Sequence, residues 1–245
     1  MVGMIFAAGI GSRLKPWTDA HPKALVPVGG VPMLGRVVQK LTDAGVSRIV
    51  VNVHHFAQQV VDYLNDLDCS VPVLISDETD RLLDTGGGLA KALPLIGDET
   101  VLIHNADILE TVNMSDLIAS HQASAADATL LVDPRVTTRR LIFTEADRLK
   151  GWTNVDTHEF RPATASLGPS DRLRAFDGVH LVSPTLYPLL RQYASTRDKF
   201  SIIDFYLHCA AQRLVMGFDI PATARWFDVG RPETLLKAND FISNS

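Results

Sequence analysis

The chain has 245 residues and a net charge of −5, and 46% of its residues are hydrophobic. This length suits an α/β domain with a sizeable core, and the acidic balance argues against a general nucleic-acid surface. No apolar run approaches the length of a membrane span, and two cysteines are too few for a disulfide framework. We therefore expect a cytoplasmic protein with no signal peptide, no membrane segment and no nucleic-acid partner.

The N-terminal stretch carries the most specific pattern. An apolar run over 4–8 predicts a buried strand of a parallel sheet, and it ends in the loop Gly9-Ile10-Gly11-Ser12-Arg13. Glycines let the backbone turn sharply, and Arg13 and Lys23 add positive charge, so a polyphosphate is the favoured ligand. A plain tight turn would explain the glycines but not the two cations. The loop is not a P-loop, because the chain contains no Gly-x-x-x-x-Gly-Lys-Ser/Thr string. It is not a dinucleotide fingerprint, because Leu14 holds the place of the third glycine.

Helices and strands alternate after this loop. The pattern predicts a helix over 31–44, a strand over 48–53, a helix over 57–67 and a strand over 71–75. This βαβαβ order indicates a parallel, twisted sheet with helices on both sides. Ligands of such sheets bind beyond the carboxyl ends of the strands, where the glycine loop lies.

A glycine-rich turn precedes the next predicted helix. Thr85 is followed by Gly86, Gly87 and Gly88. A flat ring could lie against backbone without side chains, and the peptide groups could hydrogen-bond to the edge of the ring. A flexible helix entry would need only one glycine. Glu78 and Asp84 lie close by in the sequence and are possible base or ribose contacts.

Two aspartates stand at or near strand ends in positions that suit a metal ion. Asp107 follows a predicted strand over 100–104, where a carboxylate could hold Mg²⁺ opposite the glycine loop. A helix N-cap or turn residue is the alternative for Asp107. Asp228 lies between apolar neighbours in a predicted strand, and a lone carboxylate there is costly unless a cation accompanies it.

The second half of the chain is less regular. A hairpin over 141–153 with an acidic turn is followed by a polar, mobile surface loop over 157–171. The other predicted elements are helices over 114–124, over 184–193, after 200–206 and from 232, with strands over 128–132, 173–182, 214–218 and 225–230.

Several of these motifs together resemble the signature of the sugar-1-phosphate nucleotidylyltransferases. The matching residues are Ala7-Ala8-Gly9-x-Gly11-x-Arg13, Pro16, Thr18, Pro22-Lys23, Leu25-Val26-Pro27-Val28 and Trp226-x-Asp228-x-Gly230-x-Pro232-Glu233. The resemblance implies one catalytic domain over 1–245 with a sugar-side hairpin and mobile loop at about 140–172. It also implies a Rossmann-like, mixed and mostly parallel sheet flanked by helices, of the nucleotide-diphospho-sugar transferase type.

The resemblance further implies roles for individual residues. Arg13, Lys23, Asp107 and Asp228 would act in catalysis, and the two aspartates would bind Mg²⁺. The family usually has glycine before the first of these aspartates, where this chain has Ala106. The implied nucleotide-binding residues are Ala7, Ala8, Gly9, Gly11, Ser12, Arg13, Glu78, Thr85, Gly86 and Gly87. The implied sugar-binding residues are Asn105, Asn154, Asp177, Gly178 and Asp204.

Alternatives remain for three of the sugar-side residues. Asp177 and Gly178 could form a β-bulge with a solvent-facing aspartate. Asp204 is favoured as a residue at the start of a helix.

The family contains several activities, and the pattern is most similar to the short bacterial N-acetylmuramate-1-phosphate uridylyltransferases of cell-wall recycling. That likeness favours UTP and N-acetylmuramate 1-phosphate as substrates. The alternative is a mannose- or heptose-1-phosphate guanylyltransferase. A second alternative is a regulatory subunit that binds a nucleotide sugar without turnover, although it would not need the full set of phosphate and metal residues. The sequence does not indicate an oligomeric state.

Overall fold

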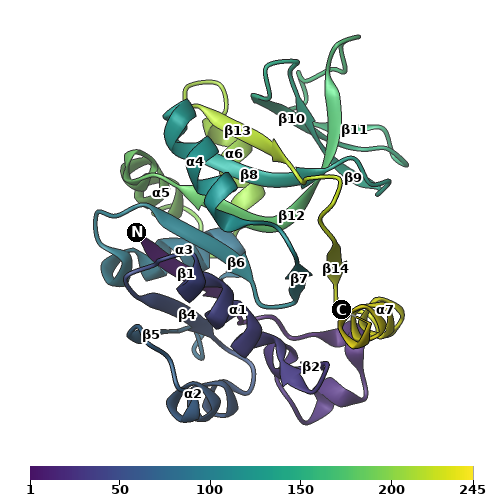
Figure 1. Ribbon diagram of the computed structural model, residues 1–245. Helices are drawn as coiled ribbons and strands as arrows, with labels where there is room; N and C mark the ends of the chain where they lie inside the picture. The colour runs from purple at the N-terminus through teal and green to yellow at the C-terminus, as the bar shows by residue number, and fades with distance from the viewer. Residues whose placement is uncertain (245) are drawn as a thin grey trace.

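A central β-sheet lies between two layers of helices in the computed structural model, which describes residues 1–244 (Figure 1). Within those residues, ten strands join in one sheet. Eight of them follow the order β11-β10-β9-β12-β6-β1-β4-β5, while β8 pairs with β12 and β13 pairs with β8. The strands of this sheet are β1 Val2–Phe6, β4 Ile49–Val53, β5 Val73–Asp77, β6 Val101–Asn105, β8 Ala128–Asp133, β9 Arg139–Phe143, β10 Leu149–Asn154, β11 Glu159–Arg161, β12 Arg172–Val182 and β13 Val215–Asp219.

The helices cover both faces because side chains alternate along each strand. In β1, Ile5 joins the core on one face, while Val2 and Met4 join the core on the other. The first face is covered by α1 Met33–Asp43, α2 Ala57–Asp66, α4 Met114–Ser124 and α7 Pro232–Ser243. The second face is covered by α3 Asp84–Ile96, α5 Tyr187–Ala194 and α6 Ile202–Cys209.

Parallel pairing in the sheet is concentrated in one half. The neighbours β6, β1, β4 and β5 all run parallel, so their carboxyl ends meet at one edge. Beyond β6, β12 runs antiparallel to β6, β8 and β9. The prediction of a mixed α/β sheet is confirmed. Fewer of its strand pairs are parallel than predicted, because β12 and the β9–β10–β11 strands pair antiparallel.

Most of the predicted elements are present, with shifted ends. The helix over 114–124 has the predicted bounds in α4. The first strand ends at Phe6, because the next two N–H groups donate to the side chain of Asn52. The predicted surface loop over 157–171 contains a short strand, β11, which pairs with β10. No helix within residues 1–244 is both long enough and apolar enough to cross a bilayer.

Two short contacts bring the C-terminal segments of the chain to the carboxyl edge of the parallel strands. The strand β14 Trp226–Asp228 pairs antiparallel with β7 Ile108–Glu110, which directly follows β6. The helix α7 then lies against the N-terminal hairpin of β2 Pro27–Val28 and β3 Val31–Pro32 (Figure 1). Asn239 Oδ1 accepts a hydrogen bond of 2.8 Å from the backbone N–H of Gly29.

Candidate active site

The glycine loop is shaped by its own residues. Gly11 has φ +70°, a conformation that favours glycine, and a Cβ there would lie 2.8 Å from Lys23 Cβ and 3.0 Å from Thr18 Cγ2. The Thr18 hydroxyl donates to the carbonyl of Gly11 at 2.9 Å. Gly11 therefore lets the loop pack against the stem of Lys23 and holds that side chain at the carboxyl edge of the sheet.

A cavity of about 440 Å³, here called the first cavity, opens beside this loop. It brings together eleven of the residues predicted to bind nucleotide or sugar or to act in catalysis. These are Ala7, Ala8, Gly9, Gly11, Ser12, Arg13, Lys23, Glu78, Thr85, Asn105 and Asp107. Lys199, which the sequence reasoning missed, adds a third basic side chain to the wall.

The inner wall of the first cavity is a buried polar network around Asn52. Its Oδ1 accepts hydrogen bonds from the N–H groups of Ala7 at 2.7 Å and Ala8 at 3.3 Å, and its Nδ2 donates to Glu78 Oε1 at 2.8 Å. Glu78 Oε2 accepts from the N–H of Leu83, and burial raises the pKa of this carboxyl. The N–H groups of Ala7 and Ala8 therefore bond within the protein. Asn52 was missed, although one polar residue in an apolar strand is a visible signal.

Two cation–carboxylate pairs stand at the mouth of the first cavity. Lys23 Nζ contacts Asp107 Oδ2, and Arg13 Nη2 lies 3.5 Å from Asp228 Oδ2. The side chains of Asp107 and Asp228 are 22% and 28% exposed, so both remain accessible from solvent. The four residues predicted to act in catalysis thus lie together.

The pairing of β14 with β7 explains how these two aspartates meet. It sets Asp228 opposite Ile108, the residue after Asp107, and the N–H of Val229 donates to the carbonyl of Asp107 at 2.9 Å. Gly230 lies against both the Lys23 and the Asp228 side chains. A Cβ on Gly230 would lie 2.7 Å from Asp228 Oδ1 and closer still to Lys23 Nζ.

The two carboxylates are a donor set that suits Mg²⁺. Within residues 1–244, no group of three or more His, Cys, Asp or Glu side chains could hold a metal ion. Mg²⁺ commonly takes one or two protein carboxylates and completes its shell with water and substrate phosphates. Asp107 and Asp228 therefore fit such an ion, and Lys23 and Arg13 balance their charge.

The glycine-rich turn does not form the bare platform that its sequence indicated. Gly86, Gly87 and Gly88 are buried near the start of α3, and none of the three lines the cavity. A Cβ on Gly86 would collide with the ring of Phe200, and the N–H of Gly86 donates to the carbonyl of Phe200 at 2.9 Å. These glycines permit close packing against the segment before α6. Thr85 and Asp84 line the cavity instead.

Asp177 and Gly178 lie in the wall behind the cavity. Gly178 has φ +78° at a register shift between β12 and β8, so the predicted bulge is present. A Cβ there would lie 2.7 Å from Nδ2 of Asn105. The alternative of a solvent-facing Asp177 is wrong, because its side chain is fully buried and pairs with Arg135.

A second cavity of about 460 Å³ lies on the side of the β9–β10–β11 strands. It contains the other two predicted sugar residues, Asn154 and Asp204, and Asp204 is also in the first turn of α6, as favoured. The cavity is lined by Arg135, Thr137, Arg139, Leu141, Trp152, Asn154, Glu159, Arg161, Ala175, Phe176, Ser201, Ile203, Asp204 and Leu207.

Comparison with known sequences gives a family match and similar relatives. The family model described as nucleotidyl transferase matches residues 2–143. An N-acetylmuramate alpha-1-phosphate uridylyltransferase of Caulobacter vibrioides is 30% identical, over 97% of this chain and 95% of its own length. A protein of the same description from Neisseria meningitidis serogroup B is 38% identical, over 51% of this chain and 54% of its own.

Solved structures share the fold across the whole chain. HddC from Yersinia pseudotuberculosis superposes with a TM-score of 0.75 at 22% identity, covering 98% of this chain and 99% of its own. An apo UDP-glucose pyrophosphorylase superposes with a TM-score of 0.79 at 15% identity, covering 100% and 99%. At these identities the likeness shows the fold alone.

Proposed function

Because the chain belongs to the nucleotidyl transferase family, we propose that it joins UTP and N-acetylmuramate 1-phosphate to give a UDP-sugar and pyrophosphate, with Mg²⁺ as cofactor. Sugar-1-phosphate nucleotidyltransferase activity is the general function, and the choice of substrates is the specific proposal. One observation carries the chemistry: Asp107 and Asp228 meet beside Arg13 and Lys23 at the mouth of the first cavity.

In the proposed reaction, an oxygen of the sugar phosphate attacks the α-phosphorus of UTP. A new P–O bond forms, the bond from the α-phosphorus to the bridging oxygen breaks, and pyrophosphate leaves. A phosphate dianion is already a nucleophile, so no general base is required. The protein must instead reduce the repulsion between two anions and stabilise the charge that develops on the transferred phosphoryl group.

The residues of the first cavity are suited to that task. Arg13 would hold the leaving pyrophosphate, while Lys23 would neutralise charge at the α-phosphate. Asp107 and Asp228 would hold Mg²⁺, which when bound supplies positive charge shared by the two phosphates. Asn52 and Glu78 fix the backbone of Ala7 and Ala8 at the inner wall and keep the loop in place.

The choice of UTP and N-acetylmuramate 1-phosphate is supported by the description of the full-length relative from Caulobacter vibrioides. We further propose that the reaction serves the recycling of cell-wall sugars in the cytoplasm. A guanylyltransferase acting on mannose or heptose 1-phosphate is the runner-up.

Pyrophosphate release with each NTP and a panel of sugar 1-phosphates, with and without Mg²⁺, tests the proposal. We expect the highest rate with UTP, N-acetylmuramate 1-phosphate and Mg²⁺. A preference for GTP with mannose or heptose 1-phosphate would support the runner-up. Binding of nucleotide sugar without any pyrophosphate release would indicate a regulatory subunit.

Asp107→Asn and Asp228→Asn test the candidate metal site. Each change removes one negative ligand with little change of volume, so we expect turnover to fall by about 1,000-fold or more while the thermal midpoint stays close to that of the wild type. Initial rates at several Mg²⁺ concentrations and thermal unfolding measure the two effects. Full activity in both variants would contradict the assignment.

A further inference from the structure

The second cavity adjoins the first, because the segment just before α6 lines both. This inference rests on the proposed function. Lys199 lines the first cavity and Ser201 lines the second. The N–H of Ile202, the residue after Ser201, donates at 2.9 Å to Oγ1 of Thr85, which lines the first cavity. On the other side, the ring of His180 contacts both Phe6 of the first cavity and Phe176 of the second.

Three guanidinium groups line the second cavity, and two of them are already neutralised. Arg135 pairs with the buried carboxylate of Asp177 and lies 3.0 Å from Asp133 Oδ2. Arg161 lies 2.9 Å from Glu159 Oε1 and 3.4 Å from Asp204 Oδ1. Both guanidinium groups are also held over indole rings.

Arg139 is the third guanidinium group, and within residues 1–244 its side chain makes no ion pair or hydrogen bond. The wall of the second cavity therefore carries one positive charge that no protein carboxylate balances. Apolar side chains, including Leu141, Phe176 and Leu207, line the same cavity beside this exposed guanidinium group.

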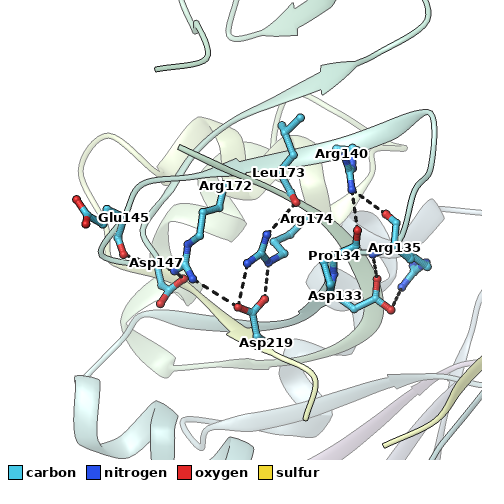
Figure 2. Close-up of polar contacts among 10 residues, drawn as sticks. All are labelled: Asp133, Pro134, Arg135, Arg140, Glu145, Asp147, Arg172, Leu173, Arg174 and Asp219. Atoms are coloured by element: carbon cyan, nitrogen blue, oxygen red, sulfur yellow. Dashed lines mark hydrogen bonds and ion pairs between the residues drawn. The ribbon is translucent and has the colours of Figure 1, made fainter. Parts of the chain in front are cut away.

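The register of the hairpin explains why Arg139 lines the cavity. In the β9–β10 pairing, Arg139 is opposite Asn154 and Leu141 is opposite Trp152, and all four residues line the cavity. The intervening Arg140 points to the other face, where it donates to the carbonyls of Pro134 and Arg135 at 2.9 Å each (Figure 2). Alternation along β9 thus directs Arg139 into the cavity. The hydrogen bonds of Arg140 hold the loop that precedes β9.

We propose that Arg139 binds a carboxylate substituent on the sugar ring, beside the amide of Asn154, and so makes the enzyme selective for acidic sugar 1-phosphates. A guanidinium group matches a carboxylate through two parallel hydrogen bonds. The lactyl group of N-acetylmuramate carries such a carboxylate, which N-acetylglucosamine lacks. The reacting phosphate would lie in the first cavity and the acidic substituent in the second.

The test compares two substrates that differ only in this group, N-acetylmuramate 1-phosphate and N-acetylglucosamine 1-phosphate. For Arg139→Gln, we expect KM for the acidic sugar to rise by about 10- to 100-fold with kcat little changed, since the contact is remote from the reacting phosphorus. The neutral sugar should change by less than about 3-fold. Arg139→Lys keeps the charge without the paired donors and should be intermediate.

Arg191→Gln is the matched control, because Arg191 is an exposed arginine of α5 that lines neither cavity. Equal losses for both sugars in Arg139→Gln would overturn the inference, since Arg139 would then bind the shared phosphate. Unchanged kinetics with both sugars would also overturn it.

The two proposals can fail separately. If the wild type releases no pyrophosphate with any sugar phosphate, the proposed function fails. Calorimetric titration of the two sugar phosphates then decides the inference: tighter binding of the acidic sugar must be present in the wild type and lost in Arg139→Gln.

Discussion

Asp177 is a fully buried carboxylate in the wall between the two cavities. Its Oδ1 is held by Arg135, and its backbone carbonyl accepts a hydrogen bond of 2.9 Å from the indole N–H of Trp226. The guanidinium of Arg135 lies 3.7 Å from the centre of the same indole ring. Burial raises the pKa of Asp177 to about 7, although Arg135 favours the ionised form.

This burial predicts that Asp177 makes stability fall as the pH rises. An unfolded aspartate has a pKa of about 3.9, so between about pH 4 and 7 the folded state binds the additional proton. The contribution is complete below pH 4 and is lost as the pH rises through 7. Asp177→Asn cannot titrate, so the wild type should lose roughly 2 kcal/mol relative to the variant between pH 5 and 8. Urea unfolding at both values measures this, and a constant difference would contradict it.

Gly230 offers a test of the geometry at the mouth of the first cavity. A Cβ there meets the flexible ends of Lys23 and Asp228, which can move, rather than backbone. For Gly230→Ala we expect kcat/KM to fall by about 10- to 100-fold, because both charged groups are displaced, with stability changed by less than about 1 kcal/mol. Kinetics and urea unfolding of the same preparation check this. Wild-type kinetics would show that the two charges need no fixed position.

The junction of α3 and α6 forms the wall that both cavities share. Gly86→Ala would bring a methyl group into the ring of Phe200, and overpacking of this kind costs about 1 to 3 kcal/mol. The helix propensity of alanine offsets up to about 1 kcal/mol. We therefore expect a net loss of stability that shrinks in a Phe200→Leu background. A double-mutant cycle by urea unfolding measures the coupling, and additive effects would contradict the contact.

At the scale of elements, the sequence predicts those helices, strands and motif contacts that depend on local residue patterns. The period of apolar residues predicts α4 and the early strands, and the motif residues predict that Asp107 and Asp228 lie together. The role of Gly86 could not be predicted in this way. Glycine at a helix start suits either a ligand or a close neighbour, and here the neighbour is Phe200, far along the chain.

At the scale of the whole molecule, the order of the sheet was the hardest feature to predict. The strand β12 joins β6, β8 and β9 through long-range pairing, and nothing in its own residues specifies those partners. The second cavity could not be predicted from the sequence either, because it forms only where β10, β12 and α6 meet. Asn154 and Asp204 were named from resemblance, but Arg139 was not, because only the register of the hairpin shows its direction.

The placement of β14 and α7 beside the glycine loop has a consequence for how the protein is made. The loop and Lys23 leave the ribosome long before Asp228 and α7, which packs against the N-terminal hairpin. Because chains begin to fold during synthesis, much of the sheet can assemble before the second candidate metal ligand exists. We therefore expect a nascent chain that does not yet include Asp228 to have much of its sheet folded and no catalytic activity.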